Sequence, residues 1–375
     1  MPKQQEVPQR MQNFVSHSDM ESFKKCRQAW DFASPLRRGL SPKVASRALQ
    51  LGTIVHMLLE VYYSPTTNRA YMVDALNTRL RSIREEEIAR ITALGLDAGQ
   101  EHEARQQLTQ VLGKAAAIMT HYRVWAREND AQWISLASEQ TFNIPVTLPT
   151  GEVVSVLGTF DTVFEARTSN TIWINDFKVT GASLDWYTQY VSFFSAQART
   201  YVWAAQKLYP DKRIGGVMFT LLKNDPPRKP ALLKNGGLSK AKHQATTWEL
   251  YRQAAQELGL APEEYSSMEE VLKHNSFVRR TQVAFHAGEI DAFDRHLKVI
   301  AQEMLDPQVA VYPSPDFFGC QRCAFKEPCR SSQQQNTTAM EYLLNLGYVP
   351  SKYAESKRAQ AIAAYSEFDD FETEA

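Results

Sequence analysis

The chain contains four cysteines, and their positions constrain the fold more than any other feature of the sequence. Cys26 lies near the start, whereas Cys320, Cys323 and Cys329 lie close together near the far end in a C-x2-C-x5-C pattern. Because no cysteine is left over, the sequence predicts one four-thiolate site that ties both ends of a domain together. Closing so long a loop costs a flexible chain about 5 kcal/mol, which four metal–thiolate bonds can offset.

The expected compartment favours a metal site over disulfides. No apolar stretch opens the chain, and no apolar run reaches the ~18–20 residues that span a bilayer, so we expect a cytosolic protein without a membrane segment. Thiols stay reduced there and suit zinc or an iron–sulfur cluster. Zinc ligands usually come as two local pairs, so the one-plus-three split favours a [4Fe–4S] cluster. Zinc remains an alternative, as does a buried Cys26 unrelated to the other three.

Charge restricts where a polyanion could bind. The chain has 42 basic and 42 acidic residues, so no global basic field exists and any such site must be local. The sequence after residue 222 is rich in basic residues, which we expect to contact nucleic acid phosphates; a solvated loop is the alternative. The candidates are Lys223, Arg228, Lys229, Lys234, Lys240 and Lys242, with Arg279 and Arg280 further along.

Paired carboxylates and a lysine fall on a predicted β-hairpin. Residues 153–165 and 171–179 alternate apolar and polar side chains around a polar turn. Asp176 and Lys178 are two apart and therefore share a face, and Asp161 on the first strand can lie beside them. Two carboxylates can hold Mg²⁺ or Mn²⁺, and the lysine can orient an attacking water. An Asp-x-Lys pattern alone usually indicates a surface salt bridge. The preceding strand with Asp161 makes the combination of the three residues more specific.

Two predicted helices carry further candidates. Gly52, His56 and Glu60 lie along one helical line, and a His56 nitrogen ligand would favour Mn²⁺ over Mg²⁺; an interior, hydrogen-bonded histidine is the alternative. Gln197 and Tyr201 are also four apart, and alone they indicate an ordinary, partly buried pair.

The periodicity predicts a single large domain. A helix beginning at Ser18-Asp19 carries Cys26 and Trp30, and further helices follow. No G-x4-G-K-[ST] phosphate loop is present, so unwinding would require a partner. The expected parts are a flexible segment 1–15; one domain 16–330, comprising a helical part 16–130, a catalytic core 131–222 and a basic loop with helices 223–330; and a partly disordered, acidic tail 331–375. Within these parts, helices are expected over residues 43–63, 72–128, 186–208, 244–259, 266–273 and 286–305, and another strand over 215–222.

In this order the motifs resemble those of the RecB-like branch of the PD-(D/E)xK nucleases. The similarity is to its iron–sulfur members, which include the CRISPR spacer-acquisition nuclease and the AddB C-terminal nuclease, and it covers residues 16–330. The matching positions are Ser16 in the opening Ser-x-Ser helix, Gly52 to His56 in G-x3-H, Asp161, Asp176 with Lys178, Gln197 with Tyr201, and the three C-terminal cysteines. Val179 stands where the family often has a hydroxyl residue, and residues 224–300 match no motif.

The resemblance implies an α/β fold, with a restriction-endonuclease-like core, a mixed central sheet flanked by helices, and helical terminal parts joined by an iron–sulfur cluster. It implies His56, Asp161 and Asp176 as metal ligands, and a 5′-to-3′ DNA exonuclease acting on single strands or ends. Recombination, repair or replication processing would follow, with a helicase or recombination protein as a partner; a phage origin is left open. The alternative is a catalytically silent DNA-binding or assembly module, against which the intact carboxylates and lysine argue.

Overall fold

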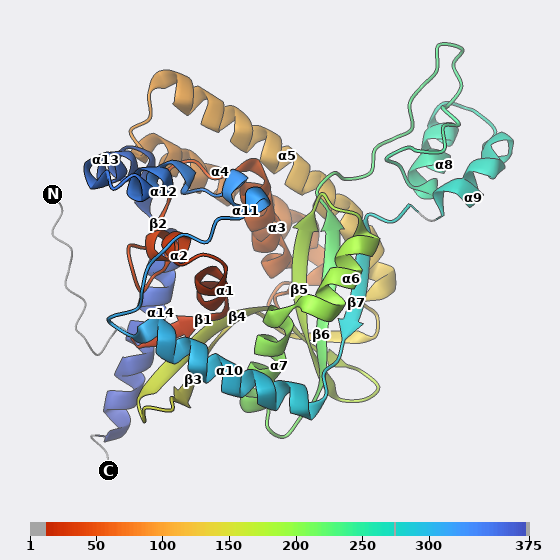
Figure 1. Cartoon of the computed structure of the whole chain (residues 1–375). Coiled ribbons are helices and arrows are strands. Elements are labelled where there is room, and N and C mark those ends of the chain that lie inside the picture. The colour runs from red at the N-terminus through yellow and green to blue at the C-terminus, as the bar shows by residue number, and fades with distance from the viewer. Residues whose placement is uncertain (1–12, 274, 373–375) are drawn as a thin grey trace.

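A six-stranded mixed sheet forms the centre of the molecule, which a computed structural model describes for residues 13–273 and 275–372 (Figure 1). β4 pairs with three strands: antiparallel with β3 along one edge, and on the other edge with β1 and β5. β5 continues the sheet through a parallel pairing with β6, and β7 closes it antiparallel to β6. The strands are β1 Phe14–Ser16, β3 Trp133–Thr147, β4 Val153–Ala166, β5 Thr171–Thr180, β6 Arg213–Lys223 and β7 Val278–Val283.

Helices cover both faces of this sheet because its central strands are apolar on both sides. One face packs against α3 Arg47–Tyr63, α4 Met72–Ala93 and α5 Ala98–Asn129. The other packs against α1 His17–Lys25, α2 Arg27–Ala33, α7 Ala196–Leu208 and α10 Ala287–Leu305. α6 Leu184–Phe194 and α7 form the crossover that the parallel pairing of β5 and β6 requires. The expected fold class, a mixed sheet flanked by helices, is confirmed.

Two expected helices are each divided by one extended residue. Cys26 has φ −162° and ψ 111°, which separates α1 from α2, and the N-cap of α1 is Ser16 rather than Ser18. Ser195 (φ −74°, ψ 101°) separates α6 from α7 and caps α7 by accepting a hydrogen bond from the Ala198 N–H. The apolar period runs through both breaks, which is why the sequence indicated single helices.

Strands β3 and β7 were not expected from the sequence. β3 contains Pro145, a register shift between Ser135 and Ala137, and a left-handed residue, Glu139, with φ 49°. β7 is short and carries two arginines. Polar residues and an irregular backbone hide the period of two that marks a regular strand.

A small module projects from the β6–β7 end of the sheet (Figure 1). Its elements are α8 Trp248–Glu257, a short 3₁₀ turn Pro262–Tyr265 and α9 Ser266–Leu272. They enclose a separate apolar cluster built around Tyr251, Met268 and Leu272. Much of the basic segment lies in the irregular chain that leads to this module, as the sequence indicated.

The two ends of the chain differ most from expectation. Phe14–Ser16, expected to begin in a flexible segment, forms β1, in which Phe14 and Val15 are buried. The tail, expected to be partly disordered, is helical through residue 372 and pairs a short strand with β2 Leu40–Pro42. The elements at the C-terminal end of the chain are α11 Phe317–Gln321, α12 Lys326–Gln333, α13 Thr337–Gly347, β8 Tyr348–Pro350 and α14 Lys352–Glu372. Met340 and Leu344 share a buried apolar cluster with Phe32, and these contacts explain why α13 is folded.

Within the described residues, no helix is both long and apolar enough to cross a membrane.

Gly216 allows the close approach of β6 and β7. It has φ +142°, and a Cβ there would lie 2.1 Å from the Val283 carbonyl oxygen, a backbone atom that cannot move aside. We therefore expect Gly216→Ala to lower the free energy of unfolding by about 2–5 kcal/mol, measured by urea denaturation. Gly288→Ala on α10 is the control, because nothing lies within 4 Å of the added methyl group. Equal unfolding free energies for the two variants would contradict this account.

Candidate active site

A gap in the pairing of β4 defines the site. β1 pairs with β4 at residues 155–157, and β5 pairs along the same edge at residues 162–165. Among the residues that the structure describes, no strand pairs with residues 158–161 on this edge, and Asp161 lies there. Its Oδ2 accepts a hydrogen bond of 2.8 Å from the Phe177 N–H, which holds the carboxylate in the fork between β4 and β5.

Three side chains meet at this fork. His56 on α3, Glu139 on β3 and Asp161 on β4 each place one ligand atom within 4.8 Å of the other two. The His56 Nδ1 lies 3.4 Å from the Asp161 Oδ2. Within residues 13–273 and 275–372, this is the one group of such ligands that close together. One imidazole nitrogen and two carboxylates are a donor set that fits Mn²⁺ or Mg²⁺.

Glu139 is the functional candidate that the sequence did not reveal. Its strand was not predicted, and without β3 beside β4 nothing places this carboxylate near Asp161. Burial, together with the Asp161 and Glu60 carboxylates, raises its pKa to about 8. Its left-handed backbone costs about 1–3 kcal/mol, a strain that is often found at functional sites. Crowded carboxylates and a strained ligand are what a bound cation would stabilise.

The other candidate catalytic residues form a hydrogen-bonded chain beside this group. Lys178 Nζ lies 2.8 Å from Asp176 Oδ2 and donates hydrogen bonds of 3.0 Å to Asp176 Oδ1 and to Gln197 Oε1. Gln197 Nε2 donates in turn to the Tyr201 hydroxyl at 2.9 Å. The sequence-predicted residues of β5 and α7 therefore do lie together, although Asp176 is not one of the three ligands that cluster tightly.

Opposing effects set the charges of Asp176 and Lys178. Asp176 is 1% exposed, and burial raises its pKa to about 6; Lys178 lowers it and Asp161 raises it further. Burial disfavours the Lys178 ammonium, but the Asp176 and Asp161 carboxylates outweigh it and raise the pKa of Lys178. Lys178 is therefore a charged hydrogen-bond donor at neutral pH and can stabilise negative charge on an oxygen atom.

The cysteines from the two ends of the chain lie near one another. Burial raises the pKa of Cys329, and the other three thiols, Cys26 among them, raise it further. Each sulfur also accepts one N–H hydrogen bond of 3.4 or 3.5 Å. The donors are the Ser314 N–H to Cys26, Asp316 N–H to Cys320, Phe325 N–H to Cys323, and Gln333 Nε2 to Cys329.

The basic candidates are scattered and mostly paired. Arg280, on β7, has a side chain only 10% exposed and contacts Asp130 at 2.7 Å, so it belongs to the interior between β7 and α5. Arg279 pairs with Asp185. The contacts of the others are Lys223 to the Ala182 carbonyl, Arg228 to Asp225, Lys229 to Glu257, and Lys240 to the Glu264 carbonyl.

Comparison with known proteins identifies the family. Residues 15–330 match the PD-(D/E)XK nuclease superfamily. The chain belongs to this superfamily. Its members are metal-dependent nucleases, and the ligand group at the fork fits that chemistry.

Other comparisons are less informative. No curated protein matches the chain. Among solved structures, one described as "Crystal structure of SSO0001" is 9% identical and covers 72% of this chain and 82% of that chain, with a TM-score of 0.25. A likeness at that TM-score carries no argument about fold or function.

The raised pKa values make metal binding depend on pH. A carboxyl group must lose its proton to bind a cation, so protonation of Glu139 below about pH 8 and of Asp176 below about pH 6 opposes binding. We expect the affinity for Mn²⁺ to rise from pH 6 to pH 8 and then level off. Isothermal titration calorimetry measures it.

The variant Glu139→Gln should bind Mn²⁺ at least about tenfold more weakly than the wild type at pH 8. Its affinity for Mn²⁺ should also increase less above pH 7. The exposed Glu152→Gln in the turn between β3 and β4 is the control. An unchanged pH profile in Glu139→Gln would remove Glu139 from the ligand set.

Proposed function

We propose that the chain is a metal-dependent DNA exonuclease that hydrolyses phosphodiester bonds in single-stranded DNA or at DNA ends. The observation that carries this proposal is the ligand group of His56, Glu139 and Asp161 beside the Asp176–Lys178 pair. A hydrolytic site needs cation ligands and a charged donor within a few ångströms, and the fork of β4 and β5 supplies both.

Each side chain then has a distinct task. His56, Glu139 and Asp161 would hold the cation, with Asp176 as the nearest further carboxylate. When bound, Mn²⁺ or Mg²⁺ would supply Lewis acidity toward the scissile phosphate and the attacking water. Lys178 orients that water and stabilises developing charge through its N–H groups. Gln197 fixes the Lys178 head group, and Tyr201 fixes Gln197, so α7 positions the lysine.

An exposed aromatic pair supports a single-stranded substrate. Trp186 and Tyr190 on α6 stack with ring centroids 5.6 Å apart and an interplanar angle of 9°, and they are 58% and 46% exposed. Tyr187, between them in sequence, is close enough to Lys178 for the ammonium to affect its pKa. Unpaired bases stack on such rings whatever their sequence. The 5′-to-3′ direction, a role in recombination, repair or replication processing, and a helicase or recombination partner follow from the resemblance to the RecB-like branch.

For the cysteines we propose a [4Fe–4S] cluster that joins the terminal parts. The N–H donors to each sulfur support it, because they are the second-sphere contacts that cluster thiolates accept.

Cleavage of end-labelled single-stranded DNA in Mn²⁺ tests the activity. We expect Asp176→Asn to reduce the rate by about 10²–10³-fold or more, because it removes the carboxylate that holds Lys178. Asp291→Asn, exposed on α10, is the matched control and should cleave normally.

Equal cleavage by wild type and Asp176→Asn would indicate a contaminating nuclease. DNA binding without cleavage by wild type would favour the silent binding module instead. Label at the 5′ or the 3′ end distinguishes the two directions of digestion.

Anaerobic purification with iron, sulfide and zinc analysis tests the cluster. We expect a brown protein. We expect Cys26→Ser to lose iron and to unfold at a lower temperature, because the cluster would no longer join the terminal parts of the chain. Lys25→Ser, at the exposed neighbouring position, should retain both properties. Zinc without iron in the wild type would establish the zinc alternative, and a stable, unchanged Cys26→Ser would show that the thiol is not part of a staple.

A further inference from the structure

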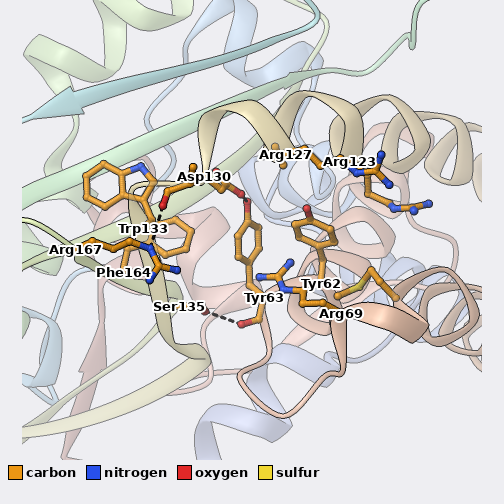
Figure 2. A pocket seen from close by; sticks show the side chains of 13 residues that line it. Tyr62, Tyr63, Arg69, Arg123, Arg127, Asp130, Trp133, Ser135, Phe164 and Arg167 are labelled. Atoms are coloured by element: carbon orange, nitrogen blue, oxygen red, sulfur yellow. Dashed lines mark hydrogen bonds between the residues drawn. The ribbon is translucent and has the colours of Figure 1, made fainter.

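A second cavity, distinct from the fork, lies between the C-terminal ends of α3 and α5 and the start of β3 (Figure 2). It encloses about 340 Å³, within the usual size range of small-molecule sites. Three buried aromatic side chains, Tyr63, Trp133 and Phe164, form the floor of its lining. None of the candidate catalytic residues lines it, so the proposed hydrolysis leaves this cavity unexplained.

The lining is strongly positive. Four arginines contribute to it, and Figure 2 shows them around the aromatic floor: Arg69, Arg123, Arg127 and Arg167. The one carboxylate in the lining, Asp130, is already engaged by Arg280 at 2.7 Å and by the Tyr63 hydroxyl at 2.5 Å.

The guanidinium groups have few partners of their own. In the part of the chain that the structure describes, no ion pair joins any of the four arginines to a carboxylate. Arg167 donates through Nε to the Ala131 carbonyl at 2.9 Å, which leaves its terminal N–H groups available. Arg69 lies over the Tyr62 ring, 4.9 Å from its centroid.

The lining therefore offers guanidinium N–H groups and positive charge that few protein groups use. Its natural ligand is an anion with several oxygen atoms, because such an anion can accept hydrogen bonds from more than one guanidinium group.

We propose that this pocket binds a phosphate monoester, either the terminal phosphate of a nucleic acid strand or that of a free nucleotide. Arginine forks match the oxygens of a phosphate, and several of them together favour a dianion over a carboxylate. A terminal phosphate carries close to two negative charges near neutral pH, whereas an internal phosphodiester carries one, so four guanidinium groups favour an end group.

The position of the pocket relates it to the fork, and this step rests on the proposed nuclease function. Tyr63 and His56 lie on the same helix, two turns apart, or ~10 Å along its axis. A strand held by its terminal phosphate would thus present an internal bond to the fork, and oligonucleotides rather than mononucleotides would be released.

Binding measurements on the cleavage-deficient Asp176→Asn chain test the proposal without relying on activity. The probes are one single-stranded oligonucleotide bearing a 5′-phosphate, a 3′-phosphate or neither, and thymidine monophosphate as a competitor. We expect one phosphorylated end to bind at least about tenfold more tightly than the unphosphorylated probe, the gain expected from about 1.4 kcal/mol of charged hydrogen bonding. If only thymidine monophosphate binds with a phosphate-dependent affinity, the free nucleotide is the ligand.

The double variant Arg123→Gln/Arg167→Gln should abolish this preference. Arg84→Gln, exposed further along α4, is the control for general loss of charge. Equal affinities for all probes before any pocket residue is changed, or an equal loss in the control, would overturn the proposal. If cleavage fails in the wild type but the phosphate preference is present, the pocket stands and the proposed nuclease function does not.

Discussion

The divided edge of β4 is the constraint on which the site depends. β1 and β5 occupy two ends of that edge, and among the described residues no strand pairs on that edge with the four residues between them. A backbone freed from pairing there lets a carboxylate turn into the space between diverging strands, where the Phe177 N–H holds it. His56 approaches from α3 and Glu139 from the strand on the opposite edge, so the sheet, rather than any loop, sets the geometry of the ligands.

The sequence predicted those parts of the site that follow from short periods. Asp176 and Lys178 share a face because they are two apart on a strand, and Gln197 and Tyr201 meet because they are four apart on a helix. The residues that it missed depend on contacts between distant segments. Glu139 lies on an irregular strand whose partner fixes its place, and no local pattern indicates that a carboxylate with φ 49° lies beside Asp161.

The structure of the terminal segments also depends on tertiary contacts that local sequence patterns do not reveal. The tail looked disordered because it is polar and ends in acidic residues, yet Met340 and Leu344 supply enough apolar contact with Phe32 to fix α13. Cys26 interrupts a continuous apolar period, and the break turns its sulfur toward the segment that contains Ser314. In both cases tertiary contacts outweigh local propensity. The sequence could have revealed these contacts only through the spacing between residues that lie far apart in the chain.

The pairing of β1 with β4 has a consequence for synthesis. β1 and Cys26 leave the ribosome well before their partners: the strand that β1 pairs with follows more than a hundred residues later, and the three other cysteines follow later still. At ~5–20 residues per second, β1 waits for roughly seven to thirty seconds. Through that interval an apolar strand remains unpaired, so the nascent chain is exposed to aggregation for longer than a protein built from local contacts.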